Sequence, residues 1–200
     1  MNYDYDMPDA ASSVHPRVGA ADPNADSLWW DRASDAGAYN IRGPGYLENK
    51  VKIPSRVSAM ECIGTQYIFS RDPIRNITAA PGHVVQEQHV GRKDRPFLFV
   101  TNFIIPQIGN WICYFARRRS EKEDPVFEKM LKEFIEGTDA HRNSRFKIIP
   151  GIPEGNFIVR STVGNKPALL GNKLDTKYYS GDNFFEVEVD VGSSMMALGM

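Results

Sequence analysis

The fold is decided by a stretch in the middle of the chain, FLFVTNFIIPQIGNWICYF, residues 97–115. Residues 97–105 form an almost unbroken apolar run, rich in β-branched and aromatic side chains and too short to span a membrane. Such a run is typical of a strand that is buried on both faces. Pro106, Gly109 and Asn110 interrupt it, and residues 111–115 resume it. This pattern predicts a β-hairpin, which we expect at the centre of a sheet.

Composition and charge narrow the class of protein. The chain has 200 residues, of which 42% are hydrophobic, as in an ordinary globular domain. Its formal net charge of -1 provides no field for gathering nucleic acid, and we find no nucleic-acid-binding motif. Cys62 and Cys113 lie far apart in apolar surroundings, which favours buried thiols in a reducing compartment. We therefore expect a cytoplasmic protein, either free or peripherally bound to a membrane.

The N-terminal residues differ in composition from the rest. Residues 1–27 are rich in Asp, Ala, Pro and Ser and have few large apolar side chains, which predicts a disordered arm. A tail that binds a partner is the alternative. Order should begin at Leu28, Trp29 and Trp30, whose large apolar surface must be buried. We expect residues 28–200 to form a single domain.

The clearest helix follows Asp124. This residue is a suitable N-cap, Pro125 suits the first helical turn, and Gly137 suits the end. Between them lies one apolar stripe, made of Phe127, Met130, Leu131, Phe134 and Ile135. We predict that this helix packs on the sheet through the stripe.

Further strands are predicted at residues 50–54, 145–150, 156–164 and 185–191, whereas residues 62–70 fit either a strand or a helical turn. In the last strand, alternation places Phe185, Val187, Val189 and Val191 toward the core. The other face, with Glu186, Glu188 and Asp190, is expected to meet water or a basic partner. Together these elements predict an α+β fold: a curved antiparallel sheet of roughly five to seven strands, with one or more helices packed on a face.

We find no motif that indicates catalysis. There is no nucleophile elbow, paired-cysteine metal site or phosphate loop, so we expect neither an enzyme nor a cofactor or metal. His83 and His89 are six residues apart, a spacing that favours solvent or loop histidines over a helical zinc pair. Asp139 and His141 lie close in sequence, but no nucleophile accompanies them.

A set of short motifs, which follow one another in a fixed order along the chain, indicates a resemblance to a known protein family. The motifs are Trp30; Arg42-Gly43 with Tyr46-Leu47 and Lys50; Phe99-Val100-Thr101-Asn102 with Pro106; Tyr114-Phe115; the run from Arg142 to Pro150 with Glu154-Gly155; Val163 to Pro167 with Leu170 to Leu174; and Asn183 to Ser194. In these motifs the chain resembles the C-terminal domain of the plant Enhanced Disease Resistance proteins, a domain of unknown function.

The chain differs from the family at a few positions, and the resemblance has implications for its length and its fold. Family members usually have proline and tryptophan where this chain has Asn156-Phe157, and a basic residue where it has Ser180. They continue into a C-terminal helix, so we expect the natural protein to extend past Met200. The plant proteins carry a pleckstrin-homology domain and a START domain upstream, neither of which fits in this chain. By analogy, the sheet could have a START-like helix-grip form.

This association with lipid domains motivates our leading hypothesis, a non-catalytic module that binds or transfers a hydrophobic lipid at a membrane surface. Arg142, Arg145 and Lys147 are the candidate ligands of an anionic headgroup. Arg117, Arg118 and Arg119 are candidate membrane contacts, although adjacent acids also fit a solvated hairpin end. Alternatively, Arg145 and Lys147 form cross-strand ion pairs with Glu186, Glu188 and Asp190. The second hypothesis is a protein-interaction or regulatory module with a packed core and no ligand.

Overall fold

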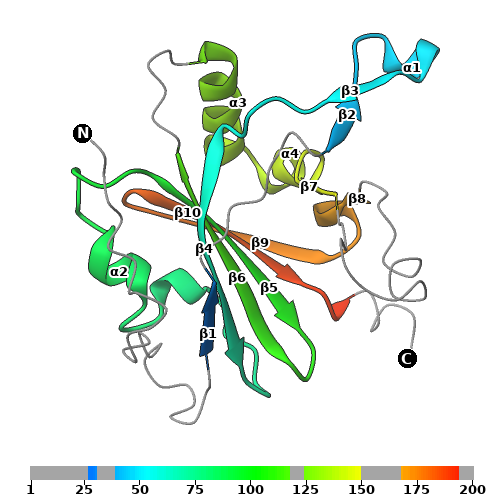
Figure 1. The fold of residues 1–200 in the computed structure, drawn as a ribbon. Helices are drawn as coiled ribbons and strands as arrows, with labels where there is room; N and C mark the ends of the chain where they lie inside the picture. The colour runs from blue at the N-terminus through cyan, green and yellow to red at the C-terminus, as the bar shows by residue number, and fades with distance from the viewer. Residues whose placement is uncertain (1–26, 31–38, 118–123, 150–167, 194–200) are drawn as a thin grey trace.

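The computed structural model describes residues 27–30, 39–117, 124–149 and 168–193, with no side-chain description for residues 27–30. Its centre is a six-stranded open sheet in the order β1-β4-β6-β5-β10-β9 (Figure 1). The strands are β1 (Ser27–Trp30), β4 (Met60–Phe69), β5 (Leu98–Ile105), β6 (Gly109–Arg117), β9 (Asp175–Gly181) and β10 (Phe184–Asp190).

The predicted hairpin is confirmed, because β5 and β6 are the two middle strands and pair antiparallel from Leu98↔Ala116 to Ile105↔Gly109. The sheet is mixed rather than antiparallel throughout. β10 runs parallel to β5, from Phe184↔Leu98 to Asp190↔Ile104. β9 and β10 form a hairpin and pair antiparallel, and no other described strand pairs with the far edge of β9. The fold is α+β, with one parallel pair in the sheet.

Gly109 makes the tight β5–β6 turn possible. Its φ of 131° lies in a region that favours glycine, and an added Cβ would lie 2.0 Å from the Ile68 carbonyl oxygen. Ile68 belongs to the neighbouring strand β4, so no side chain fits between β6 and β4 at this point. The turn therefore has to be closed by glycine.

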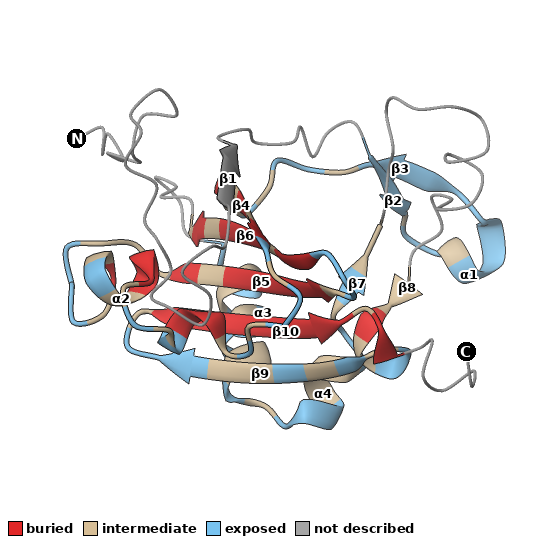
Figure 2. Ribbon diagram, turned by 90° about the horizontal axis from the view of Figure 1, so that it is seen from below, coloured by how far each residue is buried: buried red, intermediate tan, exposed pale blue. Residues whose placement is uncertain are grey.

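One face of the sheet, here called the α2 face, carries Leu98, Val100, Ile112, Tyr114 and Phe184. The segment 70–90 covers it, and includes the 3-10 turn η2 (Ile77–Ala79) and the short helix α2 (Val84–Gln88). The sequence of residues 72–82, bounded by Asp72-Pro73 and Pro81-Gly82, predicts a short helix, but only the 3-10 turn η2 forms within these residues. Figure 2 shows long buried stretches in the central strands β5, β6 and β10, with further buried residues next to α2.

The opposite face, here called the α3 face, carries Phe99, Phe103, Phe185, Val187 and Val189. The predicted helix is confirmed as α3 (Pro125–Glu136), and the Asp124 carboxylate accepts hydrogen bonds from the backbone N–H groups of Val126 and Phe127. Phe134 and Ile135 pack against the sheet, whereas Met130 at the edge of the stripe is exposed. Aromatic rings fill the centre of this face, with Phe134 against Phe99, Phe146, Tyr178 and Phe185.

Two small sheets complete the described chain. β2 (Asn40–Arg42) pairs with β3 (Lys52–Pro54) around the short helix α1 (Tyr46–Asn49). β7 (Lys147–Ile148) pairs with β8 (Ala168–Leu169), between α4 (Asp139–Asn143) and the 3-10 turn η3 (Leu170–Asn172). The predicted strand 156–164 and the predicted arm, apart from Ser27, lie outside the described residues.

Candidate functional site

Three acidic side chains of β10 lie buried on the α2 face. Strand alternation points Glu186, Glu188 and Asp190 away from the aromatic core, as the sequence predicts. Glu186 and Glu188 do not meet water, because the segment 70–79 covers them and leaves them at most 1% exposed, whereas Asp190 is 8% exposed. Buried carboxylates require hydrogen-bond donors or a cation, and the covering segment supplies both.

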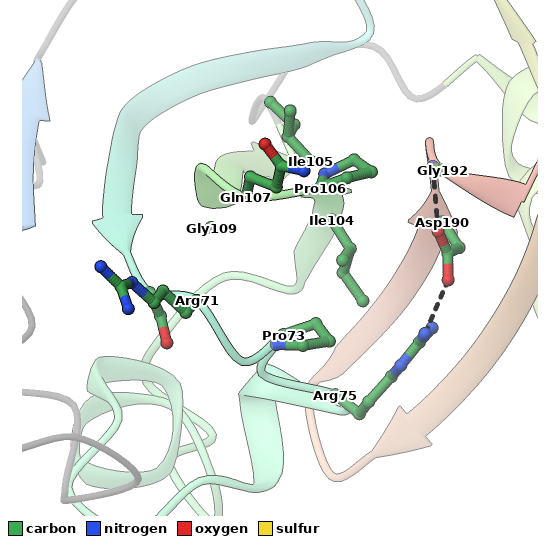
Figure 3. A pocket seen from close by; sticks show the side chains of 11 residues that line it. Arg71, Pro73, Arg75, Ile104, Ile105, Pro106, Gln107, Gly109, Asp190 and Gly192 are labelled. Carbon is green, nitrogen blue, oxygen red and sulfur yellow. Dashed lines mark hydrogen bonds and ion pairs between the residues drawn. The ribbon is translucent and has the colours of Figure 1, made fainter. Parts of the chain in front are cut away.

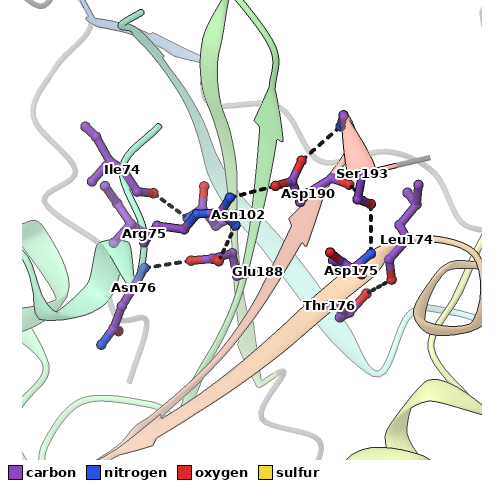
Figure 4. A network of polar contacts seen from close by, with 12 residues as sticks. Ile74, Arg75, Asn76, Asn102, Leu174, Asp175, Thr176, Glu188, Asp190 and Ser193 are labelled. Atoms are coloured by element: carbon purple, nitrogen blue, oxygen red, sulfur yellow. Dashed lines mark hydrogen bonds and ion pairs between the residues drawn. The ribbon is translucent and has the colours of Figure 1, made fainter. Parts of the chain in front are cut away.

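Arg75 provides the cation. Its guanidinium donates to Glu188 at 3.0 Å and to Asp190 at 2.6 Å, bridging two residues of one strand face (Figure 4). The backbone N–H of Asn76 donates to the second oxygen of Glu188 at 2.7 Å. The expected basic partner is thus Arg75. The predicted ion pairs with Arg145 and Lys147 are wrong, because those residues belong to the segment that covers the opposite face.

Glu186 has no cation and relies on neutral donors. The backbone N–H groups of Ile77 and Thr78, the Thr78 hydroxyl and the Asn102 amide donate to its two oxygens, at 2.6–3.2 Å. Burial raises the pKa of this carboxyl above its usual value, and the hydrogen bonds oppose that rise. Thr78 therefore fastens the η2 turn to the middle of the sheet.

Two asparagines extend the same network to the neighbouring strands. The Asn110 carbonyl oxygen accepts from the N–H of Ile74 at 3.1 Å, and the Asn110 amide donates to the Ile74 carbonyl at 2.8 Å. Asn110 also donates to Asn102 at 2.7 Å. The segment 74–78 is consequently held by three strands at once, which fixes the wall of the cavity beside it.

That cavity, of about 430 Å³, opens at the end of the α2 face next to the β5–β6 turn (Figure 3). Pro73, Ile104 and Pro106 provide apolar lining, and Arg71, Arg75 and Gln107 provide polar groups. Arg75 is paired with two carboxylates, Glu188 and Asp190, and Asp190 also lines the cavity. Arg71 is exposed and has no ion-pair partner among the described residues. The cavity thus combines apolar walls with one cation that forms no ion pair with the described residues.

An apolar wall beside a guanidinium that forms no ion pair with the described residues suits an amphipathic anion. The apolar part of such a ligand would lie against Ile104 and Pro106, and its anionic group would reach Arg71. No sequence signal predicted this site, because its residues come from three segments far apart in the chain. In the described part of the chain, His, Cys and carboxylate side chains form no group of three or more that could hold a metal ion.

The predicted headgroup residues lie elsewhere, around α4 on the α3 face. Arg142 is 14% exposed, and its guanidinium donates to the carbonyls of Phe134 and Ile135 and to Asp139. It also lies over the rings of Tyr178 and Phe185, at 5.1 and 5.3 Å from their centroids. Its contacts thus secure the end of α3. Arg145 and Lys147 are exposed, so headgroup binding by them stays a prediction.

Among the predicted membrane contacts, only Arg117 is described; Arg118 and Arg119 lie outside the described residues. Arg117 ends β6 and forms an ion pair with Glu128 of α3. Membrane contact by the three arginines stays a prediction.

His83 and His89 lie at the two ends of α2, outside the helix, as the loop prediction expects, but both are buried, so their predicted place in solvent is wrong. The Nδ1 atom of His83 accepts from the N–H of Val85 and caps α2, so its Nε2 donates to the Tyr114 hydroxyl at 3.0 Å. Tyr114 in turn donates to Gln66 at 2.8 Å. Burial lowers the pKa of His83 to about 4, which keeps the ring neutral in this relay.

Comparison with known proteins gives one family. Residues 30–200 match the family described as Protein ENHANCED DISEASE RESISTANCE 2, C-terminal. A relative from Arabidopsis thaliana, named Protein ENHANCED DISEASE RESISTANCE 2-like, is 31% identical over 179 residues. The match covers 88% of this chain but only 24% of the relative. No solved structure matches.

Proposed function

Because this chain belongs to the ENHANCED DISEASE RESISTANCE 2 C-terminal family, we propose that it is a non-catalytic, lipid-associated module acting at a membrane surface. The observation that carries the proposal is the open cavity with apolar walls and with Arg71, which has no ion-pair partner among the described residues. An amphipathic anion is the ligand chemistry that satisfies both features.

The size of the cavity limits how a lipid is held. A volume of about 430 Å³ is at the lower end of ligand pockets. It suits the headgroup region or one short stretch of acyl chain, so the rest of the lipid would stay in the bilayer. This favours binding at a membrane surface over complete enclosure of the lipid. None of the helices among the described residues is long and apolar enough to cross a membrane.

Native mass spectrometry of the purified chain, with organic extraction of any bound species, tests the proposal. We expect an anionic amphiphile in the extract, and Arg71→Glu should remove it while the control Lys93→Glu retains it. Lys93 is exposed and does not line the cavity. Loss of the same species in Arg145→Ala/Lys147→Ala would instead place the headgroup at α4. An empty chain that also acquires no lipid from vesicles would contradict the proposal.

The alternative is a protein-interaction or regulatory module with a packed core. The aromatic packing on the α3 face favours it, because Phe99, Phe134 and Phe185 occupy the space that an internal ligand would need. The two functions differ in what the cavity binds. A chain whose cavity stays empty with every amphiphile, and which binds a protein through another surface, would support the alternative.

A further inference from the structure

Residues 39–57, here called the protruding hairpin, form no part of the six-stranded sheet. β2 and β3 pair with each other, and the hairpin is closed by hydrogen bonds from the Gly43 N–H to the Val51 carbonyl and from the Ser55 N–H to the Tyr39 carbonyl. In Figures 1 and 2 it projects away from the sheet, with α1 at its tip. At the tip, the side-chain amide of Asn49 donates a hydrogen bond to the Pro44 carbonyl.

The protruding hairpin leaves large apolar side chains uncovered. Ile41 and Ile53 are direct cross-strand partners and so share a face. Leu47 at the tip and Val57 at the base are 77% and 74% exposed. Tyr39, Ile41, Val51 and Ile53 are exposed as well. So many apolar side chains gathered on one small element indicate a contact surface, since single exposed residues are ordinary but gathered ones are not.

The protruding hairpin carries an excess of positive charge. Arg42, Lys50, Lys52 and Arg56 are opposed by one acid, Glu48. Arg42 and Lys52 face each other across the strands, and the cations of Arg42 and Lys50 lie over the Tyr46 ring. In the described ranges no ion pair joins any of these four cations to an acid. The occupant of this surface therefore has to supply negative charge.

We propose that the protruding hairpin docks on an anionic phospholipid bilayer. Its apolar side chains would enter the interface between headgroups and acyl chains, as the apolar face of an interfacial helix does, and its cations would meet the phosphates. A projecting tip reaches a flat bilayer without obstruction from the body of the domain. The inference rests on the proposed function in placing the domain at a membrane, and it adds the element that makes the contact.

The hairpin is distinct from the cavity. It joins β4 at Met60, which pairs with Arg117, whereas the cavity lies at the other end of the same strand, near Phe69↔Gly109. The base of the hairpin and the predicted membrane contact at Arg117 thus share one end of the sheet. Docking and ligand binding can therefore be removed separately.

The test is flotation of the full chain with vesicles of phosphatidylcholine that contain about 30% phosphatidylserine, compared with phosphatidylcholine alone. We expect binding to the anionic vesicles only, weakened by salt. Arg42→Glu/Lys52→Glu should lower the affinity about tenfold or more. Leu47→Asp should lower it about fivefold, because the tip no longer inserts.

Matched controls separate the hairpin from general effects. Lys93→Glu/Lys173→Glu makes the same change of net charge on exposed lysines elsewhere, and Val126→Asp changes an apolar residue that is 65% exposed on α3. Both should bind within about twofold of the original chain. Equal binding by hairpin and control variants, absence of vesicle binding, or binding only to a protein partner would overturn the inference. If the hairpin variants still carry an extracted amphiphile, ligand binding in the cavity is intact. If the original chain carries no amphiphile but still floats with the vesicles, the cavity proposal is contradicted and the hairpin proposal is not.

Discussion

Glu186 is surrounded by groups that only donate hydrogen bonds to it. Two backbone N–H groups, a hydroxyl and an amide converge on its carboxylate in the interior of the sheet. A carboxylate satisfies all of them because it only accepts. This residue therefore ties η2 to the sheet by accepting, without any counter-ion of its own.

Glu186→Gln should consequently destabilise the fold although it keeps the shape of the side chain. The new amide would direct N–H groups at the N–H donors of Ile77 or Thr78, and we expect the free energy of unfolding to fall by about 2 kcal/mol. Urea denaturation of this variant and of Glu61→Gln, an exposed site on β4, provides the comparison. A loss as small as that of the control would mean that the network contributes little.

His83 makes stability depend on pH. Its pKa falls from 6.5 to about 4 on folding, because the ring is buried. A lowered pKa means that the unfolded chain binds the proton more readily. The contribution is therefore present above pH 6.5 and is lost as the pH falls toward 4.

We expect the unfolding free energy of the original chain to drop by about 2 kcal/mol more than that of His83→Gln between about pH 7 and pH 4.5. Urea titrations at the two pH values measure this difference. Some slope should persist in the variant, because burial lowers the pKa of His89 as well. Parallel pH profiles of the two proteins would show that His83 is not the source.

At the scale of elements, α3 is held at its end by Arg142. The guanidinium satisfies the carbonyls of Phe134 and Ile135, which a helix end leaves without intrahelical partners. It also contacts the two aromatic rings beneath it. This arrangement predicts a structural effect of mutation rather than an effect on ligand binding alone.

Arg142→Ala should lower the free energy of unfolding by about 2 kcal/mol, because two buried carbonyls lose their donor. Arg145→Ala, three residues along the same segment, should cost less than about 0.5 kcal/mol, since Arg145 is exposed. Thermal unfolding followed by circular dichroism distinguishes the two variants. If both variants lost the same small amount of unfolding free energy, Arg142 would have no structural role and would again be a candidate for binding a headgroup.

The elements that sequence predicted well are those governed by local pattern. The β5–β6 hairpin follows from its turn residues, and α3 follows from Asp124, Pro125 and its apolar stripe. The strand β9 had no such signal, because Asp175–Gly181 alternates weakly, and it was not predicted. Its place is set by pairing with β10.

At the scale of the whole molecule, the candidate site depends on contacts that no local pattern encodes. Arg75 reaches Asp190 across 115 positions of sequence, and the parallel pairing of β10 with β5 brings Gly192 beside Pro106. The sequence therefore predicted the acidic face of β10 but not what covers it. The cavity arises where that cover meets the central turn.

The proposed binding of an amphipathic anion in this cavity can be tested by blocking the cavity with a bulky side chain. Pro73 is exposed and lines the cavity, so Pro73→Trp should fill it without disturbing the core. Asp72→Trp adds the same indole at the neighbouring exposed position, which does not line the cavity.

The measurement is calorimetric titration with lysophosphatidic acid, a single-chain anionic lipid, below its micelle concentration. We predict saturable binding of about one molecule per chain to the original protein and to Asp72→Trp, and binding at least about tenfold weaker to Pro73→Trp. No binding to the original chain, or equal binding to both tryptophan variants, would contradict the account.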